Sequence, residues 1–220
     1  ASSAARITIW TRKRLVLMQK RRPVTIDLNA IKAALDRPGR PSSDFDLNPD
    51  AVLPEGRKLR PAGVLAAVVE GRTELELILT TRSSALKHHP GQIAFPGGKQ
   101  EEADADVTAA ALREAHEEIG LPPELVQVLG TLPPHETGTG FLVTPVLAYV
   151  GEPFQVLPET GEVAEVFQVP LSHVLNPDNY ITQSRRWRGV MRTYYTVPYG
   201  PYYIWGATAR MLRAWTDRMT

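Results

Sequence analysis

Cysteine is absent from the 220-residue chain. Its absence excludes a disulfide scaffold, a thiolate zinc site and a cysteine nucleophile, and fits a reducing compartment, so we expect a cytoplasmic protein. The chain also lacks an apolar run of the roughly 20 residues that a membrane-spanning helix needs, so we expect no membrane partner. Neither sign of charge dominates, because 25 Lys+Arg and 24 Asp+Glu leave a net charge of +1. We therefore do not expect nucleic acid as a partner.

The chain divides by composition into an extension, residues 1–58, and a main domain, residues 59–220. The extension starts with a basic arm, whose first 22 residues hold seven Lys/Arg and no acid. A short helix is expected over residues 26–35, and the Pro-, Ser- and Asp-rich stretch 36–54 is typical of a linker.

The main domain alternates strand and helix signals. Strands are expected at 63–69 and 75–81, joined as a hairpin, and helices at 106–119 and 207–219. Further strand candidates are 92–95, 126–132, 141–150, 165–169, and a pair formed by 190–197 with 202–205. This order indicates an α+β or mixed-sheet α/β layer arrangement rather than a regular βαβ series.

Three glutamates share one face of the helix expected at 106–119. Glu114, Glu117 and Glu118 are spaced i, i+3 and i+4, and fall within an arc of about 100°. Arg113 precedes Glu117 by four residues and can pair with it. Carboxylates that lie so close repel one another unless a cation neutralises them, and oxygen ligands suit Mg²⁺ or Mn²⁺ bound together with substrate phosphate. Taken alone, the same pattern also fits a solvated helix face.

A glycine pair, Gly97 and Gly98, precedes this helix, and backbone without side chains can approach a phosphate closely. The segment from Gly98 to Leu121, with its Arg113-Glu114-x-x-Glu117-Glu118-x-Gly120 core, resembles the Nudix box. The stretch from Gly98 to Arg113 is one residue longer than in the common motif, and Asp104 or a neighbour replaces the usual loop glutamate. The resemblance implies a Nudix α/β/α sandwich with a mixed β-sheet between helices.

The segment from Leu79 to Gly98 is similar to the signature of the coenzyme A diphosphatase branch of that family, with Lys87 where the branch usually has arginine. That likeness implies a metal-dependent hydrolase that cleaves the diphosphate of coenzyme A, giving 4′-phosphopantetheine and adenosine 3′,5′-bisphosphate. By the same likeness Arg82, Lys87, Gly97 and Gly98 contact the substrate.

The resemblance also assigns roles around the metal. Glu114, Glu117 and Glu118 would hold Mg²⁺ or Mn²⁺, with Glu114 and Glu118 the strongest candidates for direct ligands. Either Glu117 or Glu162 could be the general base, and Arg113 supports the catalytic set.

The sequence alone leaves other functions open. The substrate could be ADP-ribose, NADH or a dinucleoside polyphosphate, or the chain could be a Nudix-fold module that binds nucleotide or RNA without hydrolysis. The sequence also leaves open a homodimer.

Overall fold

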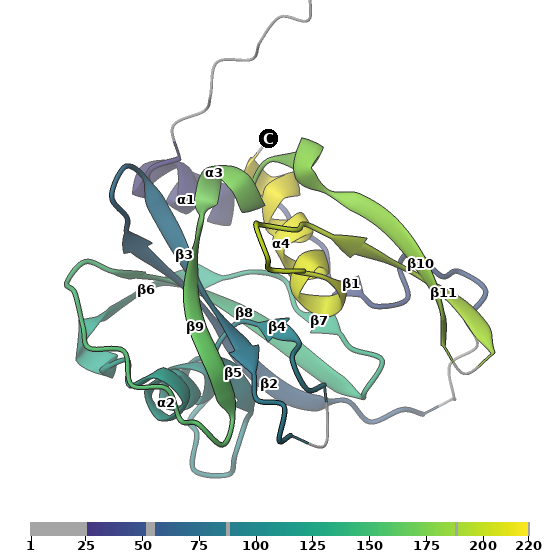
Figure 1. Cartoon of the computed structure of the whole chain (residues 1–220), viewed down its shortest axis with the longest axis horizontal. Helices are drawn as coiled ribbons and strands as arrows, with labels where there is room; N and C mark the ends of the chain where they lie inside the picture. Colours follow the sequence, from purple (N-terminus) through teal and green to yellow (C-terminus); the bar gives the residue numbers. More distant parts are fainter. Residues whose placement is uncertain (1–25, 52–55, 87–88, 188, 220) are drawn as a thin grey trace, which may run out of the picture.

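A mixed β-sheet lies between helices in the computed structural model, which describes residues 26–51, 56–86, 89–187 and 189–219 (Figure 1). This is the expected α/β/α sandwich. The helices are α1 (Leu28–Leu35), α2 (Val107–Ile119), α3 (Leu171–Val174) and α4 (Gly206–Met219), with single 3₁₀ turns at Pro123–Leu125 and Pro177–Asn179. No helix in this described part is long and apolar enough to cross a membrane.

Strand β2 (Arg60–Glu70) forms the centre of the main sheet. It runs parallel to β8 (Phe141–Val150) along ten paired residues and antiparallel to β3 (Leu75–Arg82), with which it forms the expected hairpin. β5 (Gly97–Lys99) pairs with the start of β2, so the glycine pair lies in a short strand. The other strands of this sheet are β1 (Ser42–Ser43), β3 (Leu75–Arg82), β4 (Ile93–Ala94), β5 (Gly97–Lys99), β6 (Val126–Thr131), β7 (His135–Glu136), β8 (Phe141–Val150) and β9 (Val163–Pro170).

The side chains of β2 alternate between two cores, as a strand buried on both faces requires. Leu65 and Ala67 point toward α2 and pack in the same core as Ala115 of that helix. Ala66 belongs to the core on the opposite face, which also holds Trp215 of α4. Helices α2 and α4 therefore cover opposite faces of one sheet.

The described segment 26–51 is part of this body. Asp27 caps α1 by accepting a hydrogen bond from the Ala30 amide at 2.8 Å, and Ile31 is fully buried in the core beside α4. Ser42 and Ser43 form β1 on the edge of the main sheet, although a linker was expected there. The basic arm over residues 1–22 lies outside the described residues, and the domain boundary at residue 58 stays a prediction.

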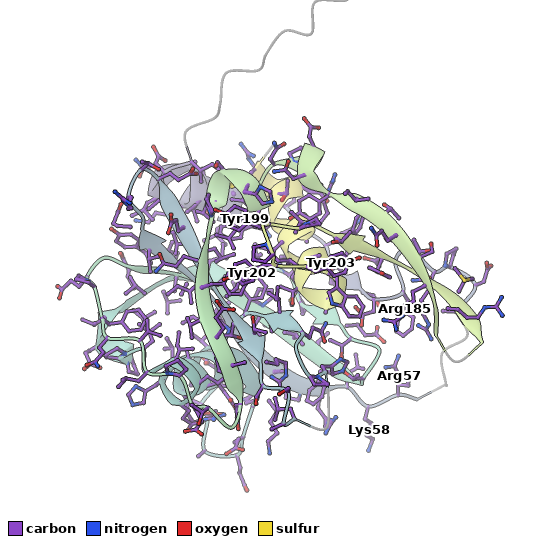
Figure 2. All side chains as sticks on the ribbon, viewed as in Figure 1. Arg57, Lys58, Arg185, Tyr199, Tyr202 and Tyr203 are labelled. Carbon is purple, nitrogen blue, oxygen red and sulfur yellow. The ribbon has the colours of Figure 1, made fainter. Side chains whose placement is uncertain are left out.

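A separate two-stranded sheet lies beside the main one, formed by β10 (Ile181–Trp187) and β11 (Val190–Thr196). The expected pairing of 190–197 with 202–205 is found only at its end, where Thr196 bridges Trp205 and the Val197 amide donates to the Ile204 carbonyl at 2.9 Å. Along its length β11 pairs instead with β10. Figure 2 shows Tyr199, Tyr202 and Tyr203 between β9 and this hairpin.

Candidate active site

Helix α2 begins and ends where its sequence dictates. Asp106 accepts a hydrogen bond from the Ala109 amide at 2.8 Å and so caps the start, and Gly120 ends the helix with a φ of 71°. Ala111, Ala115 and Ile119 are buried against the sheet. The opposite side of the helix consequently presents its glutamates toward the loops.

Glu118 is the most buried of these acids, with 5% of its surface exposed. Its Oε2 accepts a hydrogen bond from the Gly97 amide at 3.1 Å, which joins α2 to the glycine pair. Burial raises the pKa of Glu118 to about 7, although the Gly97 amide and the charge of Arg82 oppose the shift. The nearby charges of Glu114 and Glu162 raise it further.

Glu114 packs directly against Gly98. A Cβ at position 98 would collide with the Glu114 carboxylate in its present position, so glycine leaves room for this side chain to lie there. Burial raises the pKa of Glu114 as well, against the effect of the neighbouring Arg113, and the charges of Glu117 and Glu162 add to the rise. Burial and mutual repulsion therefore both disfavour the ionised carboxylates.

Arg113 forms ion pairs with three carboxylates on the exposed side of the site. Its Nη1 donates to Glu117 at 2.9 Å, which confirms the expected i, i+4 pair, and to Glu114 at 3.0 Å. Its Nε and Nη2 both donate to Asp104 at 3.0 Å, a two-pronged contact that lowers the pKa of this carboxyl. The loop acid thus orients the arginine, a role that the sequence pattern did not indicate.

The other predicted residues come from two neighbouring segments. Arg82 ends β3, and its charge acts on Glu118. Glu162 is exposed, and its carbonyl accepts a hydrogen bond from the Ser83 amide at 2.7 Å, which fixes its loop next to the end of β3. Its charge acts on both Glu114 and Glu118. Lys87 lies outside the described residues.

The donor set suits a divalent cation chemically. Carboxylate oxygens are the ligands that Mg²⁺ and Mn²⁺ take, and a cation would neutralise the repulsion between Glu114, Glu118 and Glu162. Across the described ranges, however, no group of three or more acidic or histidine side chains is assembled at metal-binding distances. Glu117 in particular faces Arg113. The residues fit the metal by chemistry and charge.

The comparisons agree with this architecture. The NUDIX domain model matches residues 59–188, and the chain belongs to the Nudix family. The chain is therefore a Nudix hydrolase that acts on a small-molecule substrate. Nudix hydrolases generally use divalent metal ions.

The chain is similar to several bacterial proteins named "Uncharacterized Nudix hydrolase NudL". The protein of Enterobacter sp. (strain 638) is 43% identical over 154 residues, which cover 70% of this chain and 80% of the relative. That of Citrobacter koseri is 42% identical over 171 residues, covering 78% and 88%.

Two solved structures are similar to part of this chain. A Nudix hydrolase from M. smegmatis, RenU, is 26% identical, with a TM-score of 0.45, and the match covers 57% of this chain and 78% of that one. The NUDIX domain of Shewanella oneidensis NrtR, solved with ADP ribose, is 16% identical, with a TM-score of 0.47, and coverage is 80% and 97%.

Proposed function

We propose that this Nudix hydrolase cleaves the diphosphate of coenzyme A, with Mg²⁺ or Mn²⁺, to 4′-phosphopantetheine and adenosine 3′,5′-bisphosphate. The hydrogen bond from the Gly97 amide to Glu118 carries the proposal. It joins the segment 79–98, which resembles the coenzyme A diphosphatase signature, to the helix that resembles the Nudix box. The residues that suggest the substrate therefore lie beside those that suggest the chemistry.

The metal would be held by Glu114 and Glu118. When bound, the cation supplies Lewis-acid polarisation of the diphosphate. Glycine at 97 and 98 lets the backbone approach the phosphates closely, since neither residue carries a side chain. Arg82, and with it Lys87, would bind phosphate oxygens through charge-assisted hydrogen bonds.

The general base is better placed at Glu162 than at Glu117. The Glu117 carboxylate is engaged by Arg113 at 2.9 Å. Glu162 is exposed on its loop, yet its charge is felt by both Glu114 and Glu118. A carboxylate that is near the ligands and free of the Arg113 contact can accept a proton from an attacking water.

A substrate panel tests the proposal. We expect kcat/KM for coenzyme A to exceed the values for ADP-ribose, NADH and a dinucleoside polyphosphate by at least about tenfold, a difference of roughly 1.4 kcal/mol. We expect Arg82→Gln to lower kcat/KM for coenzyme A, whereas Arg72→Gln, which removes the same charge from the exposed β2–β3 turn, should not. Equal rates on ADP-ribose and coenzyme A would show that the substrate is a broader class.

A further inference from the structure

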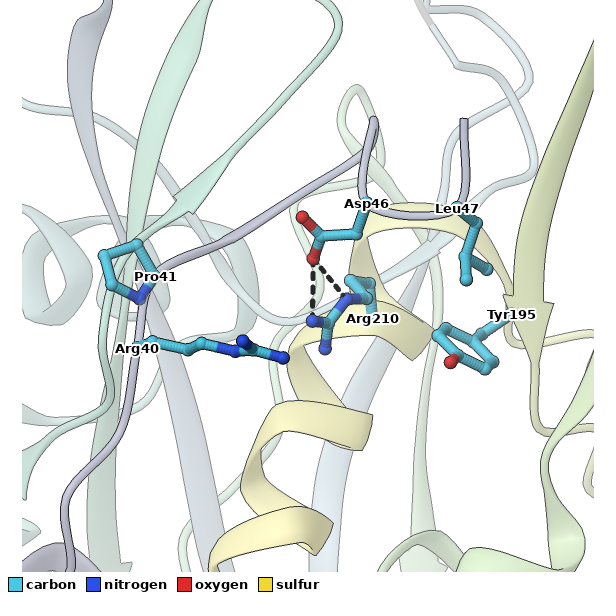
Figure 3. A pocket seen from close by; sticks show the side chains of 6 residues that line it. All are labelled: Arg40, Pro41, Asp46, Leu47, Tyr195 and Arg210. Carbon is cyan, nitrogen blue, oxygen red and sulfur yellow. Dashed lines mark hydrogen bonds and ion pairs between the residues drawn. The ribbon is translucent and has the colours of Figure 1, made fainter. Parts of the chain in front are cut away.

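A hollow whose lining residues are distant in sequence from the Nudix box lies between residues 40–47, β11 and α4. Its volume is about 410 Å³, within the range of small-molecule sites. Its lining residues are Arg40, Pro41, Asp46, Leu47, Tyr195 and Arg210 (Figure 3). Neither Arg82 nor any of the box glutamates contributes to it.

Positive side chains outnumber negative ones in the lining of this hollow. Arg210 is largely buried, and its Nε and Nη2 both bind Oδ2 of Asp46, at 2.8 and 2.7 Å. Arg40 extends toward Arg210 in Figure 3, and no acceptor for its guanidinium is found among the described residues. Among the described residues, Asp46 is the one acid that lines the hollow. The two arginines therefore outnumber the acids in its lining and leave a net positive charge there.

The segment that supplies β11 and most of α4 is rich in arginine, and Asp217 near the end of α4 pairs with Arg213 at 2.9 Å. Residues 181–216, which supply β11 and most of α4, contain six arginines and no aspartate or glutamate. A neighbouring hollow of about 450 Å³ shares Arg40 and Arg210 with the first, and Asp217 and Arg218 also line it. An arginine pair facing a cavity offers the forked donors that phosphate oxygens accept.

We propose that this hollow binds a small phosphorylated molecule that also carries hydroxyl groups. Arg40 and the free donors of Arg210 take the phosphate, and the Tyr195 hydroxyl adds a donor. The Asp46 carboxylate, which would repel a simple anion, accepts from the hydroxyl groups of the ligand. Pro41 and Leu47 contact its carbon skeleton. The proposal is independent of the substrate assigned to the catalytic box.

Isothermal titration of the full chain with ribose 5-phosphate, and with ribose as the comparison, tests this site. We expect ribose 5-phosphate to bind with a Kd below about 1 mM and ribose to bind at least about tenfold more weakly. Arg40→Gln should weaken the phosphate ligand at least about tenfold. Tyr195→Phe should weaken it by a smaller factor, roughly threefold, because only one neutral donor is lost.

Two controls separate this site from the catalytic one. Arg72→Gln removes an exposed charge elsewhere and should leave the Kd unchanged, as should Glu118→Gln in the box helix. Arg40 contacts no acceptor in the described structure, so its replacement should leave folding intact, which circular dichroism checks. Undiminished binding by Arg40→Gln, loss of binding in Glu118→Gln, or no heat with wild-type protein would each overturn the proposal.

Discussion

Replacing Gly98 by alanine should separate activity from stability. An added Cβ would lie 2.5 Å from Cδ of Glu114 and 2.8 Å from its Oε2. Ordinary carbon contacts are about 3.5–4.0 Å, so the Glu114 carboxylate must retreat by about 1 Å. That movement is cheap for folding, because it displaces the end of a flexible side chain. A misplacement of about 1 Å in a catalytic group can nevertheless cost roughly 10²-fold in rate.

Gly97→Ala is the matched comparison, with the opposite expectation. Its Cβ would collide with the carbonyl of Gly63 and lie 2.6 Å from Cα of Val64, both of which belong to the backbone of β2. The φ of 149° at Gly97 adds strain for any other residue. Because backbone cannot move aside, we expect a loss of at least about 1–3 kcal/mol in unfolding free energy.

Steady-state turnover and urea unfolding of both variants check the reasoning. Gly98→Ala should unfold within about 1 kcal/mol of wild type while kcat/KM falls by roughly 10²-fold. Gly97→Ala should shift the urea midpoint clearly downward. Wild-type kcat/KM in Gly98→Ala would refute the idea that the Glu114 position at this glycine matters for catalysis.

Three further predictions concern residues around the site and the N-terminal segment. Asp104→Asn should lower kcat by roughly tenfold with little change in KM, because Arg113 loses a charged partner and no longer holds the box glutamates in place; an unchanged kcat would contradict this. Burial alone would raise the pKa of Asp44, but the hydrogen bond and charge of His135 lower this pKa overall. The ionised Asp44 therefore stabilises the folded state above about pH 4, and this stability is lost as the pH falls further. Tm should therefore drop more steeply below pH 4 in wild type than in Asp44→Asn, and parallel curves would argue against this contribution. Asn48→Ala should cost about 1–3 kcal/mol in urea unfolding, because the Asn48 amide both donates to and accepts from the backbone of β11, at 2.9 and 2.8 Å; a change below about 0.5 kcal/mol would contradict it.

The elements with strong local signals could be predicted from the sequence. Asp106 and Gly120 mark the ends of α2, and the apolar runs at 63–69, 75–81 and 141–150 lie in β2, β3 and β8. The pairing of Arg113 with Glu117 follows from helical spacing alone. These features depend on residues only a few positions apart.

Features that depend on distant partners could not be predicted. Strand β10 was missed because Arg185 and Arg186 lie in an exposed hairpin, which lacks the apolar alternation of a half-buried strand. The segment after α1 resembles a linker in composition. It is held instead by contacts such as Asp44 with His135, 91 residues further along the chain.

Within the site, the same distinction holds. The spacing of the box placed three glutamates on one helix face, but it did not indicate that Asp104 would occupy two donors of Arg113. It also did not indicate that Glu118 would be buried beneath the Gly97 amide. Both depend on how the loop folds back onto the helix.

Mass spectrometry of the products formed from coenzyme A and Mg²⁺ tests the central claim most directly. We predict 4′-phosphopantetheine and adenosine 3′,5′-bisphosphate with wild-type protein, neither product after chelation of the metal, and at least about 10²-fold less of both with a folded Glu118→Gln variant. Intact coenzyme A with both Mg²⁺ and Mn²⁺, or undiminished products from Glu118→Gln, would contradict the account.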